Sequence, residues 1–307
     1  MAIRRRRVRR ALAVACLILQ TTSGVAWAAT TAPAAPPVLV GAGGIASCNT
    51  PGDEATAALI GRIPGARVFT AGDNAYERGT AAQFAQCYGK SWGKFKGRTR
   101  PAPGNHDYGT AGAGPYYDYF GAAAGTKGQG WYSYDVGAWH IVVLNSNCQG
   151  NSRCAKGSPQ ERWLRADLAA SRARCTAAVI HHPRFSSDNI EGNRPFVAPL
   201  WDALYAAGAD LVISGHARVY ERFRPQTPAG VADPRYGLPL INVGTGGRGH
   251  AGFKGPVTNS VVRDRTSWGV LKLTLHPDRY DFAFVPVAGA KFRDAGSGTC
   301  HGKPPVR

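Results

Sequence analysis

The chain has 307 residues, of which 44% are hydrophobic, and this combination favours one large folded core over two small ones. Its formal net charge of +18 includes six arginines within the first ten residues, so the remainder still carries +12 (18 − 6). A surface this basic attracts polyanions, unless it is simply an arginine-rich surface exposed to solvent. The sequence has no motif that reads DNA or RNA bases, which argues against specific nucleic-acid recognition.

The first 28 residues have the organisation of a signal peptide. Six arginines lie within residues 4–10, and an apolar stretch spans 11–19. Ala26-Trp27-Ala28 has the small-x-small form of a cleavage site. The apolar stretch is shorter than the roughly 20 residues that cross a bilayer, so a membrane anchor is the less favoured alternative. We therefore expect a secreted protein, exported by the Sec or the twin-arginine pathway, with no transmembrane segment after signal removal.

Cysteine usage agrees with export. Six cysteines follow the signal peptide, and an even number in a secreted chain indicates disulfide bonds. Cys148 and Cys154 bracket a short loop and are the easiest pair to join. The other expected pairs, whose connectivity the spacing alone does not fix, are Cys48 with Cys87 and Cys175 with Cys300. No close Cys-x-x-Cys pair is present, so a zinc cluster built on cysteine is not expected.

After the signal peptide, short apolar runs alternate with segments of helical pattern. The runs expected to form strands are residues 38–41, 67–71, 131–135, 140–145, 177–180, 211–214 and 240–243. Two further alternating runs, 269–275 and 281–287, flank a His276-Pro277-Asp278 turn and indicate a hairpin.

Helices are expected over residues 53–62, 81–88 and 195–207, and from Ser158 onward, where a capping box is combined with proline at the first helical position. This order of elements indicates an α/β fold with a mixed sheet or two packed sheets and helices outside. The expected divisions are a signal peptide (1–28), a Pro/Ala-rich lead-in (29–37), one domain (38–300) and a C-terminal tail (301–307).

Polar side chains follow four of the extended segments, at the strand ends where open α/β sheets place their ligand sites. The four motifs are Gly72-Asp73-Asn74-Ala75-Tyr76, Gly104-Asn105-His106-Asp107, His181-His182-Pro183 and Gly215-His216-Ala217-Arg218. Carboxylate, amide and imidazole groups are ligands for a divalent cation of intermediate hardness. The sequence therefore predicts a metal site at this edge.

These motifs resemble those of the calcineurin-like metallophosphoesterases, and within them the purple-acid-phosphatase-like branch of secreted bacterial type. That branch is marked by Gly-Asp-x-x-Tyr, Gly-Asn-His-Asp/Glu, His-x-Pro and Gly-His-x-His-x-Tyr-Glu-Arg, and the resemblance covers residues 38–287. It implies a sandwich of two mixed β-sheets flanked by helices, with a two-metal centre at the strand ends. Asp73 matches the carboxylate that bridges the two metals, and the remaining ligands of the second metal match Asn105, His181 and His216.

The ligands of the first metal depart from the family pattern. Tyr76 matches its phenolate ligand, but Gly44 stands where the family has an aspartate, and Arg218 where it has a histidine. A guanidinium is always protonated and cannot bind a metal, so this site should hold an ion weakly. Two interpretations stay open. Arg218 supplies a fixed positive charge that holds Asp73 and a phosphate oxygen, or the site has simply decayed.

His106 matches the histidine that contacts the phosphoryl oxygen and assists the leaving group, often together with an acid such as Asp107. The resemblance therefore implies an exported metal-dependent phosphoric ester hydrolase acting on monoesters, with His106 and Arg218 as catalytic groups. We expect one tightly bound ion of iron, zinc or manganese rather than two. The alternative is an inactive protein of the same fold that binds phosphate or an anionic cell-wall polymer. His140 and His182 are expected to be structural.

Overall fold

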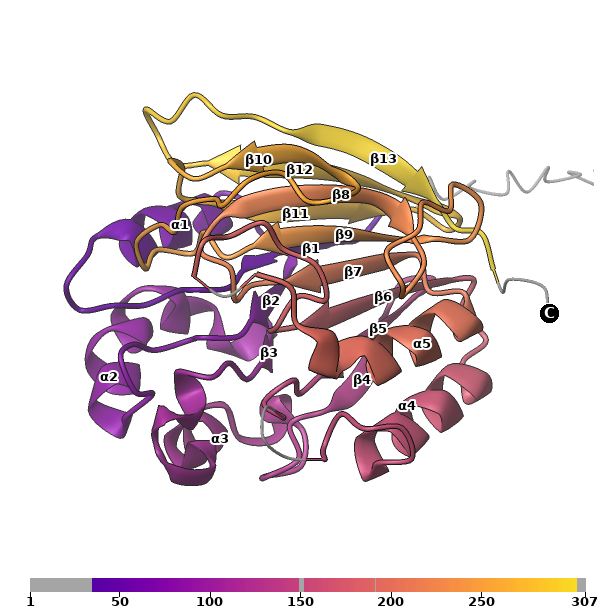
Figure 1. The fold of residues 1–307 in the computed structure, drawn as a ribbon. Coiled ribbons are helices and arrows are strands. Elements are labelled where there is room, and N and C mark those ends of the chain that lie inside the picture. The colour runs from indigo at the N-terminus through magenta and orange to yellow at the C-terminus, as the bar shows by residue number, and fades with distance from the viewer. Residues whose placement is uncertain (1–34, 149–151, 191, 303–307) are drawn as a thin grey trace, which may run out of the picture. The chain divides into compact units, whose positions relative to one another are not determined.

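Two β-sheets packed against each other form the body of the molecule in this computed structural model, which describes residues 35–148, 152–190 and 192–302 (Figure 1). The first sheet has six strands in the order β13-β12-β11-β1-β2-β3, and the second has seven in the order β10-β8-β9-β7-β6-β5-β4. The expected signal peptide lies outside the described residues, as do most of the lead-in and most of the tail. Among the helices that are described, none combines the length and apolar character needed to cross a bilayer.

The strands of the first sheet are β1 (Val38–Ala42), β2 (Arg67–Ala71), β3 (Thr99–Ala102), β11 (Gly269–Leu275), β12 (Arg279–Pro286) and β13 (Ala295–Thr299). Those of the second are β4 (Tyr132–Val136), β5 (Trp139–Leu144), β6 (Cys175–Ile180), β7 (Leu211–Ser214), β8 (Tyr220–Gln226), β9 (Leu238–Val243) and β10 (Ser260–Asp264). The α-helices are α1 (Gly52–Gly61), α2 (Ala81–Gln86), α3 (Gly114–Phe120), α4 (Pro159–Ala170) and α5 (Ala198–Ala207).

Both sheets are mixed, and the parallel strands of each bring their carboxyl ends to the site edge. β1, β2 and β3 run parallel in the first sheet, and β5, β6, β7 and β9 run parallel in the second. The antiparallel strands β11 and β12 form the predicted hairpin. The expectation of two mixed sheets flanked by helices is therefore confirmed.

The main hydrophobic core lies between the sheets, and a second core lies beneath α4 and α5 on the outer face of the seven-stranded sheet (Figure 1). The predicted cap of α4 is half correct. Ser158 Oγ accepts a hydrogen bond from the Glu161 amide at 3.1 Å, as a capping box requires. The Glu161 carboxylate, however, accepts from the Gly157 amide at 3.0 Å instead of from the amide of Ser158. The helix still begins at Pro159 with Ser158 as its N-cap, and only the partner of the Glu161 carboxylate lies one residue earlier than the motif predicts.

All three expected disulfides are present among the described cysteines. They are Cys48–Cys87, Cys148–Cys154 and Cys175–Cys300. The last joins the start of β6 in one sheet to the residue that follows β13 in the other. This bond therefore ties the two sheets together at the edge opposite the site, where β6 begins.

His140 on β5 is a structural residue held between two carboxylates. Its Nε2 lies 2.8 Å from Asp167 and its Nδ1 lies 2.8 Å from Asp135. The hydrogen bond to Asp167 and that to Asp135 raise the pKa of the imidazole above its usual value, although burial opposes them. Because the folded-state pKa lies above the unfolded one, the stabilisation is complete below about pH 6.5 and is lost as pH rises through the folded value.

We expect that His140→Gln will destabilise the protein more at pH 5.5 than at pH 8.5. The measurement is thermal unfolding of both proteins across this range, with His276→Gln as the comparison, because His276 is a partly buried histidine that faces one carboxylate, Asp281, instead of two. An equal loss of stability at both ends of the range would show that His140 is neutral in the fold and does not act as an ion-pair partner.

Candidate metal centre

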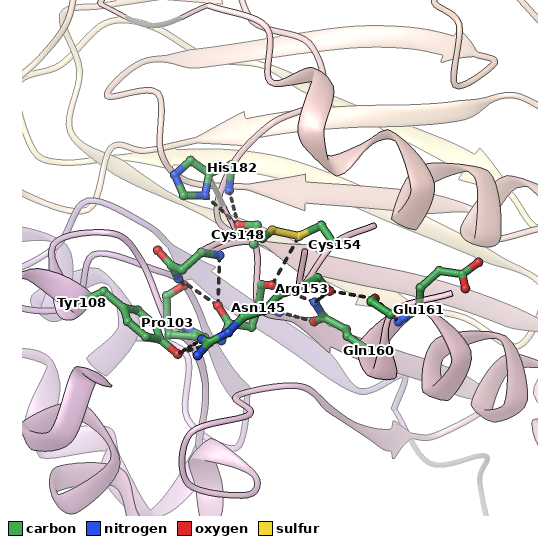
Figure 2. Close-up of a disulfide and its surroundings, with 12 residues drawn as sticks. Pro103, Tyr108, Asn145, Cys148, Arg153, Cys154, Gln160, Glu161 and His182 are labelled. Carbon is green, nitrogen blue, oxygen red and sulfur yellow. Dashed lines mark hydrogen bonds between the residues drawn. A yellow bond between two sulfur atoms is a disulfide. The ribbon is translucent and has the colours of Figure 1, made fainter. Parts of the chain in front are cut away.

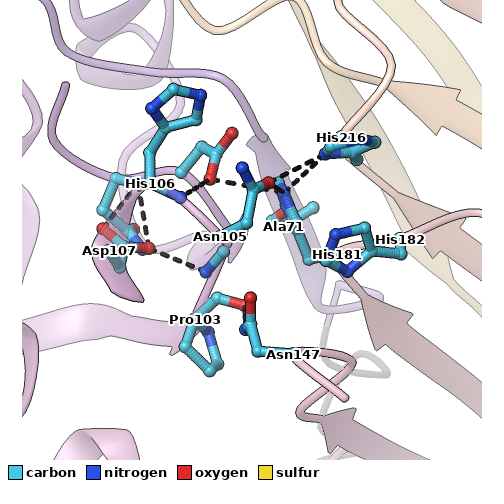
Figure 3. Close-up of polar contacts among 12 residues, drawn as sticks. Ala71, Pro103, Asn105, His106, Asp107, Asn147, His181, His182 and His216 are labelled. Atoms are coloured by element: carbon cyan, nitrogen blue, oxygen red, sulfur yellow. Dashed lines mark hydrogen bonds and ion pairs between the residues drawn. The ribbon is translucent and has the colours of Figure 1, made fainter. Parts of the chain in front are cut away.

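Four side chains from four loops converge at the edge where the parallel strands end. Asp73 follows β2, Asn105 follows β3, His181 follows β6 and His216 follows β7. We call these four residues the ligand cluster. Figure 3 shows Asn105, His181 and His216 pointing toward one another from the two sheets. The sequence motifs thus meet in space as the resemblance implied.

The polar atoms of the ligand cluster are very close together. Asn105 Oδ1 lies 2.9 Å from both His181 Nε2 and His216 Nδ1, and these two ring nitrogens are 3.0 Å apart. Asp73 Oδ1 lies 3.3 Å from His181 Nε2. Four donors held tetrahedrally at about 2.1 Å from one ion would be about 3.4 Å from each other. The spacing therefore fits a single metal ion with little movement.

Hydrogen bonding indicates that a nitrogen lone pair of His181 faces this cluster. Its Nδ1 lies 2.8 Å from the carbonyl oxygen of Ala71. A carbonyl only accepts hydrogen bonds, so Nδ1 carries the proton of the neutral ring and Nε2 is left with a lone pair. That lone pair faces the oxygens of Asn105 and Asp73, which are themselves acceptors. A cation at this point resolves the conflict between these electron-rich atoms.

The protonation states also suit metal binding. Burial lowers the pKa of His181 to about 4 and that of His216 to about 4, so both rings are neutral at neutral pH. Arg194 Nη2 donates to His216 Nε2 at 3.2 Å, so the proton of this ring is on Nδ1 and has to move to Nε2 when Nδ1 binds a metal. Burial alone would raise the pKa of Asp73. The nearby rings of His181, His106 and His216, together with the His106 amide, outweigh burial and leave that pKa below its usual value. The cluster thus offers one carboxylate and two neutral imidazoles.

Two glycines make the convergence possible. A β-carbon on Gly104 would lie 2.2 Å from Asp73 Oδ1, and one on Gly72 would lie 2.3 Å from His181 Nδ1. Gly72 also has a φ of 82°, in the left-handed region that glycine adopts without a steric cost. These contacts explain why glycine precedes the ligand in the motifs around Asp73 and Asn105.

His182 lies beside the cluster, yet its hydrogen bonds assign it a structural role. Ser146 Oγ accepts from the His182 amide at 2.9 Å and lies 2.8 Å from His182 Nδ1. Ser146 thus contacts both the amide and Nδ1 of His182, and Nδ1 is not available to a metal while this hydrogen bond is kept. Cys148, whose disulfide to Cys154 is drawn in Figure 2, donates its amide to the carbonyl oxygen of Ser146 at 2.9 Å. Ser146 is therefore hydrogen-bonded both to Cys148 and to His182.

The first-metal position is arranged differently. Tyr76 is expected to be a ligand, but its hydroxyl donates to Asp73 Oδ2 at 2.8 Å. Burial and then the Asp73 charge raise the pKa of Tyr76 well above its usual value, so the phenol stays protonated. Gly44 has a φ of 63°, and a β-carbon there would lie 2.9 Å from the Gly244 carbonyl oxygen. The backbone leaves little room for the aspartate that the resemblance implies at this position.

Arg218 lies at the cavity beside these residues, without the contact to Asp73 that the first of the two open interpretations requires. Within the described part of the chain, no ion pair or hydrogen bond joins its guanidinium to Asp73, whose oxygens accept from Tyr76 and from the His106 amide. Arg218 lines the cavity together with Tyr76 and His106. Its charge is therefore placed to meet an incoming anion.

His106 and Asp107 also differ from the expectation that they act as a pair. His106 Nδ1 lies 2.7 Å from the carbonyl oxygen of Glu77, so Nδ1 carries a proton and Nε2 is the remaining nitrogen. Asp107 instead accepts hydrogen bonds from the Asn74 amide and side chain and from the Gly104 amide. Burial and the Asp73 charge raise the pKa of Asp107 to about 7. Asp107 therefore orients the loops that carry the ligands.

The cavity over the cluster has a volume of about 230 Å³, and its lining includes residues that the motifs did not single out. Among them are Glu77 and Arg248, which form an ion pair of 2.7 Å. A larger cavity of about 520 Å³ lies toward the amino ends of β7 and β9, lined by groups such as Arg224, Tyr280 and Phe282. The ligand cluster opens into the smaller cavity, which is therefore the candidate chemical site.

Comparison with known proteins identifies the family. The sequence model of the calcineurin-like phosphoesterase family matches residues 51–220, more than half of the chain. The chain belongs to this family. The family is metal-dependent, in agreement with the geometry of the ligand cluster.

Two curated proteins are similar to part of the chain. Purple acid phosphatase 18 of Arabidopsis thaliana is 32% identical over 130 residues, which are 40% of this chain and 28% of that protein. An uncharacterized protein of Mycobacterium tuberculosis (strain CDC 1551 / Oshkosh) is 31% identical over 162 residues, 46% of this chain and 30% of its own length. The chain thus spans less than a third of these curated relatives.

Two solved structures share the fold at low identity. The purple acid phosphatase PPD1 of yellow lupin has a TM-score of 0.67 at 19% identity, covering 85% of this chain and 53% of its own. GAP50, the anchor in the inner membrane complex of Plasmodium, has a TM-score of 0.66 at 15% identity, covering 88% and 90%. These likenesses establish the metallophosphoesterase sandwich.

Proposed function

We propose that the chain is an exported hydrolase of phosphate monoesters that works with one tightly bound metal ion. The observation that carries the proposal is the ligand cluster, where the His181 lone pair faces two further acceptors at 2.9 and 3.3 Å. Export is supported by the three disulfides, which persist in oxidising compartments, and by the signal-like residues 1–28. The loss of two first-metal positions, at Gly44 and Arg218, supports a single ion.

Asp73, Asn105, His181 and His216 would hold an ion of iron, zinc or manganese, because their nitrogen and oxygen donors suit metals of intermediate hardness. Such an ion, when bound, polarises the phosphoryl group and makes water a better nucleophile. Tyr76 donates its hydrogen bond to Asp73 and so fixes the orientation of that carboxylate.

The remaining groups act on the substrate. His106 donates its Nδ1 proton to the Glu77 carbonyl, so Nε2 is the nitrogen left for the substrate. In the imidazolium form of the ring, Nε2–H gives its proton to the leaving oxygen, and the ring is left neutral. Arg218 lines the same cavity and offers paired N–H donors to phosphoryl oxygens. Because a guanidinium keeps its charge at any working pH, it supplies positive charge where the family keeps its first metal.

The second candidate is a protein of the same fold that binds phosphate or an anionic cell-wall polymer without turnover. The basic composition of the chain favours it, since +12 remains after the arginine-rich start. A protein with this fold is described as an anchor, so the fold alone does not make a catalyst. The two candidates differ in turnover.

The test is release of phosphate from an aryl phosphate by the purified protein, alongside metal analysis. We expect about one ion per chain, and loss of turnover on chelation that is restored by iron, zinc or manganese. Two tightly bound ions per chain would contradict the single-metal proposal. Phosphate retention without turnover for any added metal would favour the binding protein.

A variant that restores the family pattern sharpens the test. In the double change Gly44→Asp, Arg218→His, the new aspartate must displace the Gly244 carbonyl, so its fold has to be checked by circular dichroism. If this variant gains turnover that the parent lacks entirely, the natural chain is not a hydrolase.

A further inference from the structure

Arg248 is a second cation in the catalytic cavity that no motif marks. It follows β9 in a glycine-rich loop, which packs on the loop after β1 that contains Gly44. The Arg248 amide donates to the Gly44 carbonyl oxygen at 2.9 Å, and the Gly246 amide donates to the Gly43 carbonyl oxygen at 2.9 Å. The backbone of Arg248 is thus fixed against one of the two altered first-metal positions.

The side chain of Arg248 packs against Tyr76, which matches the tyrosine that the family uses for its first metal. Its guanidinium carbon is 5.4 Å from the centre of the Tyr76 ring, a cation–π distance. Arg248 lines the cavity together with Arg218, Tyr76 and His106. Each of the two altered positions of the first-metal site therefore either carries a guanidinium or lies in hydrogen-bond contact with a residue that carries one. The two guanidiniums are those of Arg218 itself and of Arg248, held at Gly44.

The guanidinium of Arg248 does not use all of its N–H donors within the described residues. One Nη donates to Glu77 Oε1 at 2.7 Å, whereas Nε is buried without a hydrogen-bond partner among the described residues. The Arg248 side chain is 26% exposed and that of Glu77 is 48% exposed. An ion pair this accessible to water is weak and exchanges readily for another anion.

We propose that Arg218 and Arg248 form an oxyanion-binding pair in place of the first metal, and that Glu77 occupies Arg248 until a tetrahedral oxyanion displaces it. The ligand class is a phosphate group, free or esterified, because a planar guanidinium matches two oxygens of such a group. This inference rests on the proposed function for its biological use. The binding itself requires neither the metal nor turnover.

The test measures binding of inorganic phosphate to chelator-treated protein by isothermal titration calorimetry. Arg248→Ala is expected to weaken binding roughly 10- to 100-fold, the usual effect of losing hydrogen bonds to a charged group. Arg248→Lys should fall between the two, because it keeps the charge and loses the fork. The control is Arg62→Ala, an exposed arginine after α1, which should bind like the parent.

A double-mutant cycle tests the role of Glu77. Glu77→Gln removes the competing carboxylate and should tighten phosphate binding roughly two- to five-fold. In the Arg248→Ala background the same change should have no effect, because the arginine it releases is absent. An equal gain in both backgrounds, or none in the parent, would overturn the proposal. Thermal unfolding confirms that each variant is folded.

Failure of this inference is distinguishable from failure of the proposed hydrolase. A protein that binds phosphate through Arg218 and Arg248 but releases none from an ester would refute the hydrolase and leave the anion pair intact. Turnover that persists in Arg248→Ala with an unchanged KM, and phosphate binding unaffected by the change, would refute the anion pair and leave the hydrolase.

Discussion

Replacing His216 by alanine should lower the affinity for the metal ion by more than about 100-fold, because even changes outside the ligand set cost roughly 10- to 100-fold. His216 Nδ1 is one of four donors that lie within 2.9–3.3 Å of a neighbour in the cluster. Its removal leaves three donors and opens the cluster to water. Metal content after dialysis and turnover of an aryl phosphate are the two measurements, and they should fall together.

His276→Ala is the matched control for this change. His276 pairs with Asp281 on the hairpin and takes no part in the cluster, so the ion should be retained. Retention of one ion by His216→Ala at parental affinity would place the metal elsewhere, and the four-ligand assignment would be wrong. The partly exposed position of His216 keeps the risk of misfolding lower than for the fully buried His181.

Arg218→Ala should lower kcat by about 10²- to 10³-fold, the usual cost of removing one donor that stabilises developing negative charge. The side chain lines the cavity without an ion pair to Asp73, so its loss should affect the reacting phosphoryl group more than the folded scaffold. Arg218→Lys should recover part of kcat through its charge, but not the paired hydrogen bonds.

Steady-state kinetics on an aryl phosphate with saturating metal give kcat and KM for each Arg218 variant. Arg62→Ala serves again as the matched control, since that residue is exposed and remote from the cavity lining. If Arg218→Ala turns over like the parent, the arginine has no catalytic role and the first-metal position has merely decayed.

The fold was largely predictable because the buried parallel strands are apolar runs and the β11–β12 hairpin alternates. The edge strand β13 could not be predicted, since Ala295–Thr299 has no alternation of apolar residues. A β-carbon on Gly298 would lie 2.5 Å from the Tyr280 ring, so tertiary packing selects glycine there in spite of its low strand propensity. The strands β3, β8 and β10 and the short helix α3 were not predicted either, because strand pairing and tertiary packing, and not a local pattern, form them.

The metal side of the candidate site was predictable because each ligand sits in a motif fixed by a strand end. The anion side was not. Glu77 and Arg248 are far apart in the sequence, and their ion pair depends on how two loops meet. The hydrogen-bond partner of His106 could not be predicted either, because it is the backbone carbonyl of Glu77, and a sequence motif records side chains only.

The three disulfides have a consequence for how the protein has to be produced. Every cysteine in the described part of the chain is bonded to another, so a metal ion in the ligand cluster would meet only nitrogen and oxygen donors. In a reducing cytoplasm the same residues would be six free thiols, and thiolates bind zinc and copper tightly. A recombinant protein made there would carry metal at competing sites, so faithful metal stoichiometry requires expression with oxidative folding.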